Sequence, residues 1–335
     1  MLAAWYNNFG TAENVLETGE FAEPKPGKGE VKIKIYSSGV NPSDTKKRAG
    51  SNPDILDDGP VIPHSDGAGE IVDVSDEKLR HRIGEKVWVY ESQHNRRLGT
   101  AAEFVCLPSN NAVRLPDGVS YDTGAMLGIP AMTAHRCVYN SDGIRDRYVL
   151  ITGGAGRVGH YCIQWAKKAG AIVIATSSNN EGGQECKKAG ADIILGHPSE
   201  TFKEEILDLT KGHKIDKIID GDFGKNINHL LSVIKPNSSI STYASMTEKT
   251  PVIPFYKMMN LNVQMKMVFV YDMPKKAKDY AILDITKALK GNKLLNRLYK
   301  NYNLKEIEHH NVNALVPHWL IQSYEYLDQK FPHLK

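Results

Sequence analysis

Residues 148–170, with the sequence YVLITGGAGRVGHYCIQWAKKAG, constrain the fold of this chain more than any other segment. An apolar strand-like run leads directly into Gly153, Gly156 and Gly159, and apolar residues then recur at helical spacing. This strand, loop and helix pattern is typical of a dinucleotide-binding turn, where glycines let the backbone approach a pyrophosphate and unpaired N–H groups at the helix start attract it. The alternative is a glycine-rich turn that only lets a helix pack on a strand.

Apolar runs alternate with segments of helical periodicity throughout the chain beyond residue 121. The strands predicted there are 148–152, 171–176, 191–195, 214–220 and 238–244. Strands that alternate with helices indicate right-handed crossovers and a parallel, doubly wound sheet. A further helix is predicted from Pro274 to Gly291, with apolar residues on one face.

The first third of the chain has a different pattern. Short segments that alternate apolar and polar residues, such as VKIKI at 31–35, are separated by turns rich in Gly, Pro, Asn and Asp. Further strands are predicted at 68–74, 85–90 and 101–107. We therefore expect a mostly β domain, barrel-like in form, ahead of the α/β domain.

Composition supports two domains and excludes several functional classes. The chain has 335 residues with 41% hydrophobic content, enough for two ordinary cores. A net charge of +3 with both signs interspersed does not indicate nucleic acid. The four cysteines are widely spaced, and no apolar run approaches the length of a membrane span. We expect a cytoplasmic protein with reduced thiols.

The end of the second predicted strand bears on the choice of cofactor. An NAD site usually places an Asp or Glu there, whereas this chain has Thr176, Ser177 and Ser178. Without a carboxylate to repel the extra phosphate, and with hydroxyls to donate to it, NADP(H) is favoured. Glu181 is close enough in sequence to leave NAD(H) as the alternative, and Arg157 in the glycine loop is a cation that could approach the phosphates.

Four further motifs occur in a fixed order with the glycine loop. They are GVNPSDT (39–45), VIPHSDGAGEIVDV (61–74), GTAAEFV (99–105) and LGIPAMTAHR (127–136). In this order the chain resembles, over essentially its whole length, the zeta-crystallin-like quinone reductases of the medium-chain dehydrogenase/reductase superfamily. The resemblance implies an N-terminal GroES-like β-barrel domain and a Rossmann domain with a doubly wound parallel sheet. It also implies a homodimer or homotetramer.

The domain boundaries that follow are 1–120 for the GroES-like catalytic domain, 121–265 for the NADP-binding domain and 266–335 for a segment returning to the first domain. The resemblance implies an active site between the domains. It also implies a helix within residues 314–329 and a final strand after it, which is either absent or was trimmed from a sequence that ends at Lys335.

The resemblance also predicts that the protein uses no metal. The three positions that hold the catalytic zinc in alcohol dehydrogenases of the superfamily are Asn41, Ser65 and Ile129 here, and these cannot form a normal zinc ligand set. His64 is one position from a ligand site, but lacks partners there. Hydride transfer to an electron-poor acceptor needs orientation and exclusion of water rather than a Lewis acid.

Three residues are candidates for the catalytic site. Asn41 offers two donors and an acceptor to the nicotinamide or a substrate carbonyl, and its alternative role is a turn residue before Pro42. Thr133 corresponds to a nicotinamide-contacting threonine, or is a helix-face residue. Lys46 replaces a tyrosine of many family members and would bind an acidic substrate or the phosphates, or else is a surface charge.

The cofactor site is expected to draw on the loop and on the ends of later strands. The family lysine that often meets the 2′-phosphate falls at Gly182, and a family tyrosine falls at His197. The residues expected to bind NADP(H) are Gly153, Gly154, Ala155, Gly156, Arg157, Val158, Gly159, Thr176, Ser177, Ser178, His197, Tyr243, Ala244 and Phe269.

The function predicted from the sequence is an NADPH-dependent quinone oxidoreductase that works without metal, by one- or two-electron transfer. The first alternative is a 2-alkenal or enone reductase, which needs a proton donor near the α-carbon. The second is an NADPH-binding protein with a crystallin-like or RNA-associated role, for which the only support is a pI near 8.4 and a lysine-rich span at 275–305.

Overall fold

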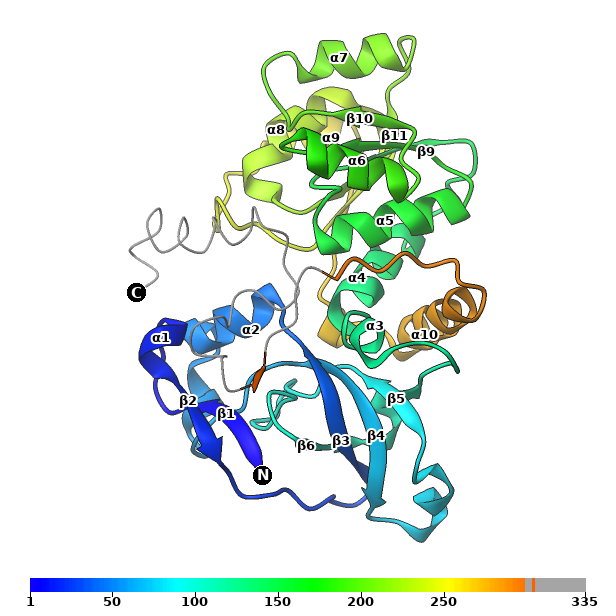
Figure 1. Ribbon diagram of the computed structural model, residues 1–335. Coiled ribbons are helices and arrows are strands. Elements are labelled where there is room, and N and C mark those ends of the chain that lie inside the picture. Colours follow the sequence, from blue (N-terminus) through cyan, green and yellow to red (C-terminus); the bar gives the residue numbers. More distant parts are fainter. Residues whose placement is uncertain (299–302, 305–335) are drawn as a thin grey trace. The chain divides into compact units, whose positions relative to one another are not determined.

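The computed structural model describes residues 1–298 and 303–304 and divides into two compact units (Figure 1). Met1–Ile129 and the described residues from Ile282 onward form the first unit, and Pro130–Ala281 form the second. The functional boundaries predicted after residues 120 and 265 stay predictions. The helix predicted within 314–329, and the expectation for a strand after it, lie outside the described residues.

Antiparallel strands dominate the first unit. They are β1 (Leu2–Tyr6), β2 (Leu16–Glu20), β3 (Glu30–Gly39), β4 (Asp66–Val74), β5 (Lys86–Val89), β6 (Phe104–Pro108) and β7 (Ala112–Arg114). Five of them form a sheet in the order β6-β3-β4-β5-β7, and β1 pairs with β2. In β3, Val31 and Ile33 are fully buried in the core, whereas Lys34, the next residue along the strand, is exposed. This is the alternation seen in the sequence. The predicted strands thus correspond to β3, β4, β5 and β6.

Short helices connect these strands. They are α1 (Ala12–Val15), α2 (Pro42–Lys46), a π-helical turn (Lys47–Ser51), 3-10 turns at Pro53–Leu56, Glu77–Arg82 and Ser109–Asn111, and α3 (Tyr121–Ala125). Asn41 caps α2 and Pro42 occupies its first turn, where a missing N–H costs nothing. Helix α3 packs against β3 and β4.

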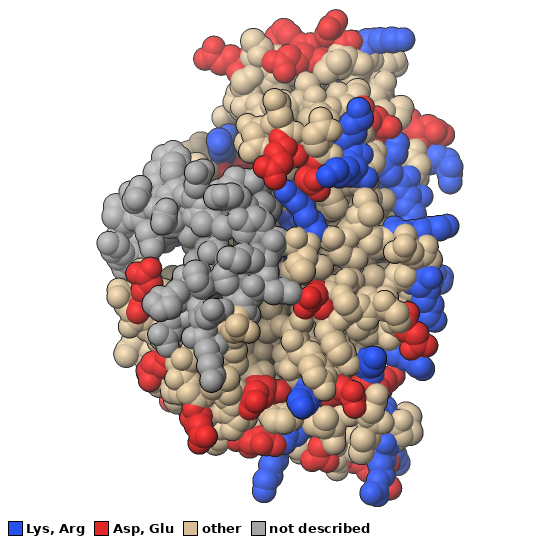
Figure 2. Space-filling model, viewed as in Figure 1, with Lys and Arg blue, Asp and Glu red and all other residues tan. Residues whose placement is uncertain are grey.

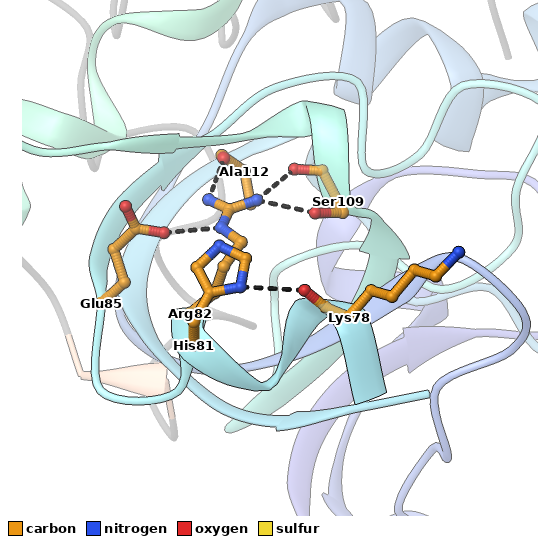
Figure 3. A network of polar contacts seen from close by, with 6 residues as sticks. All are labelled: Lys78, His81, Arg82, Glu85, Ser109 and Ala112. Carbon is orange, nitrogen blue, oxygen red and sulfur yellow. Dashed lines mark hydrogen bonds and ion pairs between the residues drawn. The ribbon is translucent and has the colours of Figure 1, made fainter. Parts of the chain in front are cut away.

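Arg82 joins two loops of the first unit through a network of polar contacts (Figure 3). Its Nε donates to Glu85 Oε2 at 2.6 Å, and its two terminal nitrogens donate to the carbonyls of Ser109 and Ala112 at 2.7 Å each. The planar guanidinium can satisfy three directions at once, which an ammonium group cannot do. This side chain therefore holds the start of β7 to the turn before β5.

The second unit contains one parallel sheet. Its strands are β8 (Tyr148–Ile151), β9 (Ile172–Thr176), β10 (Ile193–Leu195), β11 (Ile215–Asp220), β12 (Ile234–Thr242) and β13 (Gln264–Met267). They lie in the order β10-β9-β8-β11-β12-β13, and every pairing is parallel. The strand order reverses next to β8, as in a doubly wound dinucleotide-binding fold. The prediction of this sheet is confirmed, although β13 was not among the predicted strands.

The remaining helices belong to this unit, except that two of them have one end in the first unit. They are α4 (Gly128–Tyr139), which begins in the first unit, α5 (Arg157–Lys168), α6 (Asn180–Lys188), α7 (Phe202–Leu209), α8 (Phe223–Val233), α9 (Phe255–Asn260) and α10 (Lys275–Lys290). Helices α5 and α6 contact each other, as do α7 and α8 (Figure 1). The core against α7 and α8 includes Leu150, Ile218, Ile206 and Ile227, each at most 1% exposed. Helix α10 confirms the helix predicted between Pro274 and Gly291.

Candidate functional site

The glycine loop connects the carboxyl end of β8 to the first turn of α5. Gly153 has φ of 61°, a left-handed conformation that glycine adopts without strain. A Cβ atom on Gly159 would lie 2.3 Å from the carbonyl oxygen of Gly153, and one on Gly154 would lie 2.9 Å from the Cβ of Ala175. Loop, helix and neighbouring strand therefore pack too closely for side chains. The backbone cradle fits a dinucleotide pyrophosphate, since the first N–H groups of α5 have no partner within the helix.

Thr176 holds this loop from the neighbouring strand. Gly154 N donates to the carbonyl of Thr176 at 2.8 Å, and Gly153 N donates to its hydroxyl at 3.0 Å. The same hydroxyl lies 3.2 Å from Nδ1 of His197. Thr176 is fully buried, so it supports the loop from within the protein. Direct contact of Thr176 with the cofactor stays a prediction.

The other residues predicted to bind the cofactor all follow strand ends. Ser177 and Ser178 follow β9, His197 follows β10, Tyr243 and Ala244 follow β12, and Phe269 follows β13. Because the strands are parallel, their carboxyl ends meet at one edge of the sheet, the usual site for a nucleotide in this architecture. The structure thus brings the predicted set to the same edge as the glycine loop.

Two aspartates at this edge were missed by the sequence analysis. Asp220 at the end of β11 is fully buried and accepts hydrogen bonds from Thr152 Oγ1 at 2.5 Å and from Asn226 Nδ2 at 2.8 Å. Burial raises its pKa, and these hydrogen bonds oppose the rise. Asp222 accepts from the backbone N–H groups of Met246 and Thr247 at 2.8 and 3.0 Å. The two carboxylates fix the loops after β8 and β12, a role that no local pattern reveals.

Asn41 lies in a buried polar cluster of the first unit. It is 4% exposed, its backbone N–H donates to Asp44 Oδ2, and its Nδ2 donates to Asp66 Oδ2, both at 2.8 Å. The backbone N–H of Ile129 also donates to Asp66 Oδ2 at 2.8 Å. One carboxylate therefore joins two of the three positions that correspond to metal ligands in zinc-dependent relatives. Asp66 was not a predicted site residue, although it lies within a quoted motif.

Lys47, the neighbour of the predicted Lys46, points into this cluster. Its Nζ donates to the carbonyl of Gln93 at 2.9 Å and to Ser65 Oγ at 3.3 Å. Burial lowers the pKa of Lys47, and the charges of Asp44 and Asp66 oppose that shift. Lys46 is exposed at the end of α2. Its catalytic role stays a prediction.

The described part of the chain offers no cluster of ordinary metal ligands. No three His, Cys, Asp or Glu side chains there are grouped so that they could hold a metal ion. Asn41, Ser65 and Ile129 do not supply such a set either. Metal-independent chemistry therefore stays a prediction, based on the types of residue at these three positions.

Thr133 lies on α4 in the second unit. Its side chain is 5% exposed. The nearby His135 contacts the rings of Tyr139 and Trp165, with centroids 4.5 and 5.4 Å away. Packing of this kind holds the threonine in one orientation. Such an orientation is compatible both with a nicotinamide contact and with a helix-face residue. Its contact with the nicotinamide stays a prediction.

Comparison with known proteins identifies both units. A model of alcohol dehydrogenase GroES-like domains matches residues 27–117, and a model of zinc-binding dehydrogenases matches residues 158–285. The quinone oxidoreductase of Rattus norvegicus is 30% identical over 68% of this chain and 68% of its own length. A chloroplastic quinone-oxidoreductase homolog of Spinacia oleracea is 32% identical over 67% of this chain and 69% of its own. These matches confirm the predicted GroES-like and Rossmann architecture.

Solved structures show the same fold. A mycobacterial protein complexed with NADPH has a TM-score of 0.81 at 23% identity, covering 92% of this chain and 94% of that one. The Escherichia coli quinone oxidoreductase complexed with NADPH also has a TM-score of 0.81, at 19% identity and the same coverage. Among the described residues of this chain, no helix is both long and apolar enough to cross a membrane. Given its relatives and its fold, the chain belongs to the zeta-crystallin-like quinone oxidoreductases of the medium-chain dehydrogenase/reductase superfamily.

Proposed function

We propose that the protein is a cytoplasmic, NADPH-dependent quinone oxidoreductase that converts a quinone, NADPH and a proton into a hydroquinone and NADP⁺. The observation that carries the proposal is the glycine loop at the start of α5, where a Cβ on Gly154 or Gly159 would lie within 2.9 Å of a neighbouring atom, so that glycine is needed at both positions. Membership in a family whose relatives are named quinone oxidoreductases gives the acceptor class.

The chain's own residues have distinct parts in this reaction. The first turn of α5 binds the pyrophosphate, and Tyr243, Ala244 and Phe269 at the ends of β12 and β13 line the nicotinamide end. Bound NADPH supplies the hydride. Asn41 has one amide proton committed to Asp66, which fixes the orientation of its side chain. We assign the substrate or nicotinamide contacts to Asn41, Thr133 and Lys46.

Reduction of an activated carbon–carbon double bond is the second candidate. A 2-haloacrylate reductase from Burkholderia is 25% identical over 65% of this chain and 66% of its own length. Such a reaction needs a proton at the α-carbon, which a phenol could donate. Burial raises the pKa of Tyr243 well above its ordinary value, so this phenol is a poor acid. The quinone reaction, whose product oxygens can take protons from water, is therefore favoured.

The test is NADPH oxidation measured against 1,4-benzoquinone, 9,10-phenanthrenequinone, trans-2-hexenal, 2-chloroacrylate and buffer alone, each with and without EDTA. We expect turnover of the quinones, unchanged by EDTA. Turnover of the alkenes alone would establish the second candidate. Tight NADPH binding without turnover of any acceptor would leave only a binding role. Loss of activity with EDTA would contradict the metal-independent mechanism.

We also propose that the protein forms a homodimer through the β13 edge of its parallel sheet. Among the described strands, β13 is the last in the sheet order, and the edge of a sheet readily accepts another strand. Exposed apolar side chains gather in the segments beside it: Val252 is 90% exposed, Tyr256 74%, Met267 70% and Phe255 65%. Light scattering should give twice the mass of the chain for the wild type, and Met267→Glu should shift the protein towards monomers. A monomeric wild type would contradict this part of the proposal.

A further inference from the structure

A cavity of about 640 Å³ lies at the amino ends of the parallel strands in the second unit. It is lined by residues 146–148, by the turn at 212–214, and by Asp216 and Lys235. A volume of this size is typical of sites for small molecules. The glycine loop follows the carboxyl end of β8, whereas the cavity is formed beside the first residue of that strand. The cavity is therefore distinct from the cofactor site.

The turn between α7 and β11 forms one wall of this cavity and is held in a fixed shape. Thr210 is fully buried, and its hydroxyl lies 2.8 Å from the carbonyl oxygen of Ile206 and 2.5 Å from that of His213. Lys211 and Gly212 both have positive φ, 54° and 84°, so the chain reverses direction within a few residues. Buried hydrogen bonds of this kind fix the position of His213 at the cavity.

Asp216 joins the other walls of the cavity. Its Oδ2 accepts a hydrogen bond from the backbone N–H of Tyr148 at 3.0 Å, and its Oδ1 accepts one from Lys235 Nζ at 3.1 Å. The carboxylate is 17% exposed, whereas the lysine side chain is 59% exposed. Asp216 therefore connects the starts of β8, β11 and β12, and its charge is already matched by Lys235.

Arg147 and Lys214 give the cavity its positive charge. Both are exposed, and no carboxylate in the described part of the chain forms an ion pair with either of them. With His213 left aside, the wall holds three basic residues and two acidic ones, so one positive charge exceeds the negative charge. Acidic side chains, by contrast, gather over α7, which leads into the same turn (Figure 2). The positive charge is therefore local to the cavity.

Two rings add a flat surface to these charges. The rings of Tyr148 and His213 are stacked, with centroids 6.1 Å apart and an angle of 27° between their planes. His213 is exposed, so a planar group can also stack against the imidazole from the cavity. Cations beside a flat surface favour a ligand that combines a negative group with an aromatic ring.

We propose that this cavity binds a small aromatic carboxylate, with the carboxylate paired to Arg147 and Lys214 and the ring stacked on His213. A guanidinium can hold a carboxylate through two parallel hydrogen bonds, which gives direction as well as charge. A single net positive charge matches a monoanion better than a phosphate ester, which carries about −1.5 to −2 at pH 7. The inference does not depend on the proposed function, because none of these residues has a part in quinone reduction.

The test is binding of 2-naphthoate to the full chain, measured by calorimetry. Acetate supplies the charge without the ring, 2-naphthalenemethanol supplies the ring without the charge, and 2-naphthyl phosphate supplies a dianion. We expect 2-naphthoate to bind about tenfold more tightly than each of them. Arg147→Gln should weaken its binding by about tenfold, and His213→Ala by about threefold. The matched control is Lys211→Gln, since Lys211 belongs to the same turn but does not line the cavity, and its Kd should stay within about twofold of the wild type.

Three outcomes would overturn the inference. Unchanged binding in Arg147→Gln, or equal weakening in Lys211→Gln, would remove the ligand from the cavity. Tighter binding of 2-naphthyl phosphate than of 2-naphthoate would contradict the ligand class. Competitive inhibition of quinone reduction by 2-naphthoate, equal in the wild type and in Arg147→Gln, would place the ligand in the quinone site instead. If the protein reduces no quinone but Arg147→Gln weakens binding as expected, the inference stands and the proposed acceptor falls.

Discussion

The glycine loop of the second unit and the Asn41 cluster of the first are built in opposite ways. The loop depends on main-chain atoms and on the absence of side chains, with a Cβ on Gly159 predicted to lie 2.3 Å from a carbonyl oxygen. The cluster depends on the side chains of separate segments. In it, the Asp66 carboxylate accepts hydrogen bonds from Asn41 Nδ2 and from the backbone N–H of Ile129, at 2.8 Å each. A site made of backbone is local in sequence, whereas a site made of side chains is assembled by the fold.

This difference predicts different sensitivities to mutation. Adding atoms should damage the loop, because it has no room for them. Removing a hydrogen-bonding group should damage the cluster, because it leaves buried partners unsatisfied. The following substitutions test that contrast, in order of expected effect.

Gly156→Asp should abolish cofactor binding. Gly156 caps α5, and its Cβ would lie 3.2 Å from the carbonyl of Gly153, so an alanine nearly fits. A carboxylate there meets the pyrophosphate, and such like-charge contacts cost several kcal/mol, or a loss of affinity of about 100-fold or more. Titration of NADPH by fluorescence would measure it, with Gly156→Ala as the control. Unchanged affinity in Gly156→Asp would show that the loop does not bind the pyrophosphate.

Asp66→Ala should destabilise the first unit. It leaves the Asn41 amide and the Ile129 N–H buried without their acceptor, at about 1–3 kcal/mol for each group, or about 4 kcal/mol together. Urea unfolding would measure the loss, and Asp66→Asn should lose less because its carbonyl can still accept. Binding of 2′,5′-ADP by the folded variant should persist. A drop in stability of less than about 1 kcal/mol would mean that the cluster is not built around this carboxylate.

Lys217 tests a side-chain-built site within the second unit. It is 1% exposed in β11, and its Nζ donates to Asn140 Oδ1 at 3.0 Å and to Ser141 Oγ at 2.5 Å. Burial lowers its pKa from 10.5 to about 8. Between these values the unfolded chain binds more protons than the folded one, so this lysine makes the free energy of unfolding rise with pH, by roughly 3 kcal/mol in all.

Lys217→Met should remove that rise. The difference in stability between variant and wild type would be measured by urea unfolding at several pH values from 7 to 10. We expect the free energy of unfolding of the wild type to increase relative to that of the variant as the pH increases. A difference that stays constant over this range would show that Lys217 keeps an ordinary pKa in the folded protein.

Arg82→Lys should have the smallest effect. The lysine can keep the ion pair with Glu85 but cannot reach the carbonyls of Ser109 and Ala112 as well, so we expect a loss of about 1.5 kcal/mol. Thermal unfolding would measure it, with Arg80→Lys on the exposed side of the same turn as the control. An equal decrease in Tm in both variants would show that the contacts of Arg82 with Ser109 and Ala112 do not account for the effect.

Sequence patterns were most informative where a property repeats along one element. The alternation in β3 and the apolar runs of β8, β9 and β11 predicted the strands, because burial of a sheet face imposes a period on the residues that form it. β13 was missed, since QMKM is short and only partly buried at the sheet edge. β1 was missed for a different reason, since its sequence LAAWY has no alternation of apolar and polar residues.

Individual site residues were harder to predict. Lys46 and Lys47 are adjacent in sequence, yet only Lys47 turns towards Ser65 and Gln93, and the direction is set by how α2 passes into a π-helical turn. Likewise, Asp66, Asp220 and Asp222 have no distinctive spacing. Their partners come from segments that are distant in the chain.

The sequence by itself determined the dinucleotide-binding fold and the position of its glycine loop, because the left-handed turn at Gly153 and the close approach of Gly159 to its carbonyl oxygen involve residues close together in the chain. Through its resemblance to the family, the sequence also places Asn41, Ser65 and Ile129 at the positions of zinc ligands, a set that does not form a normal zinc site. Only the tertiary structure decided which side chains from distant segments surround these positions. A Cβ at Gly182 would lie 2.3 Å from Ser177 Oγ, and Asp66 gathers the Asn41 cluster, because contacts between distant segments depend on packing that no local pattern specifies.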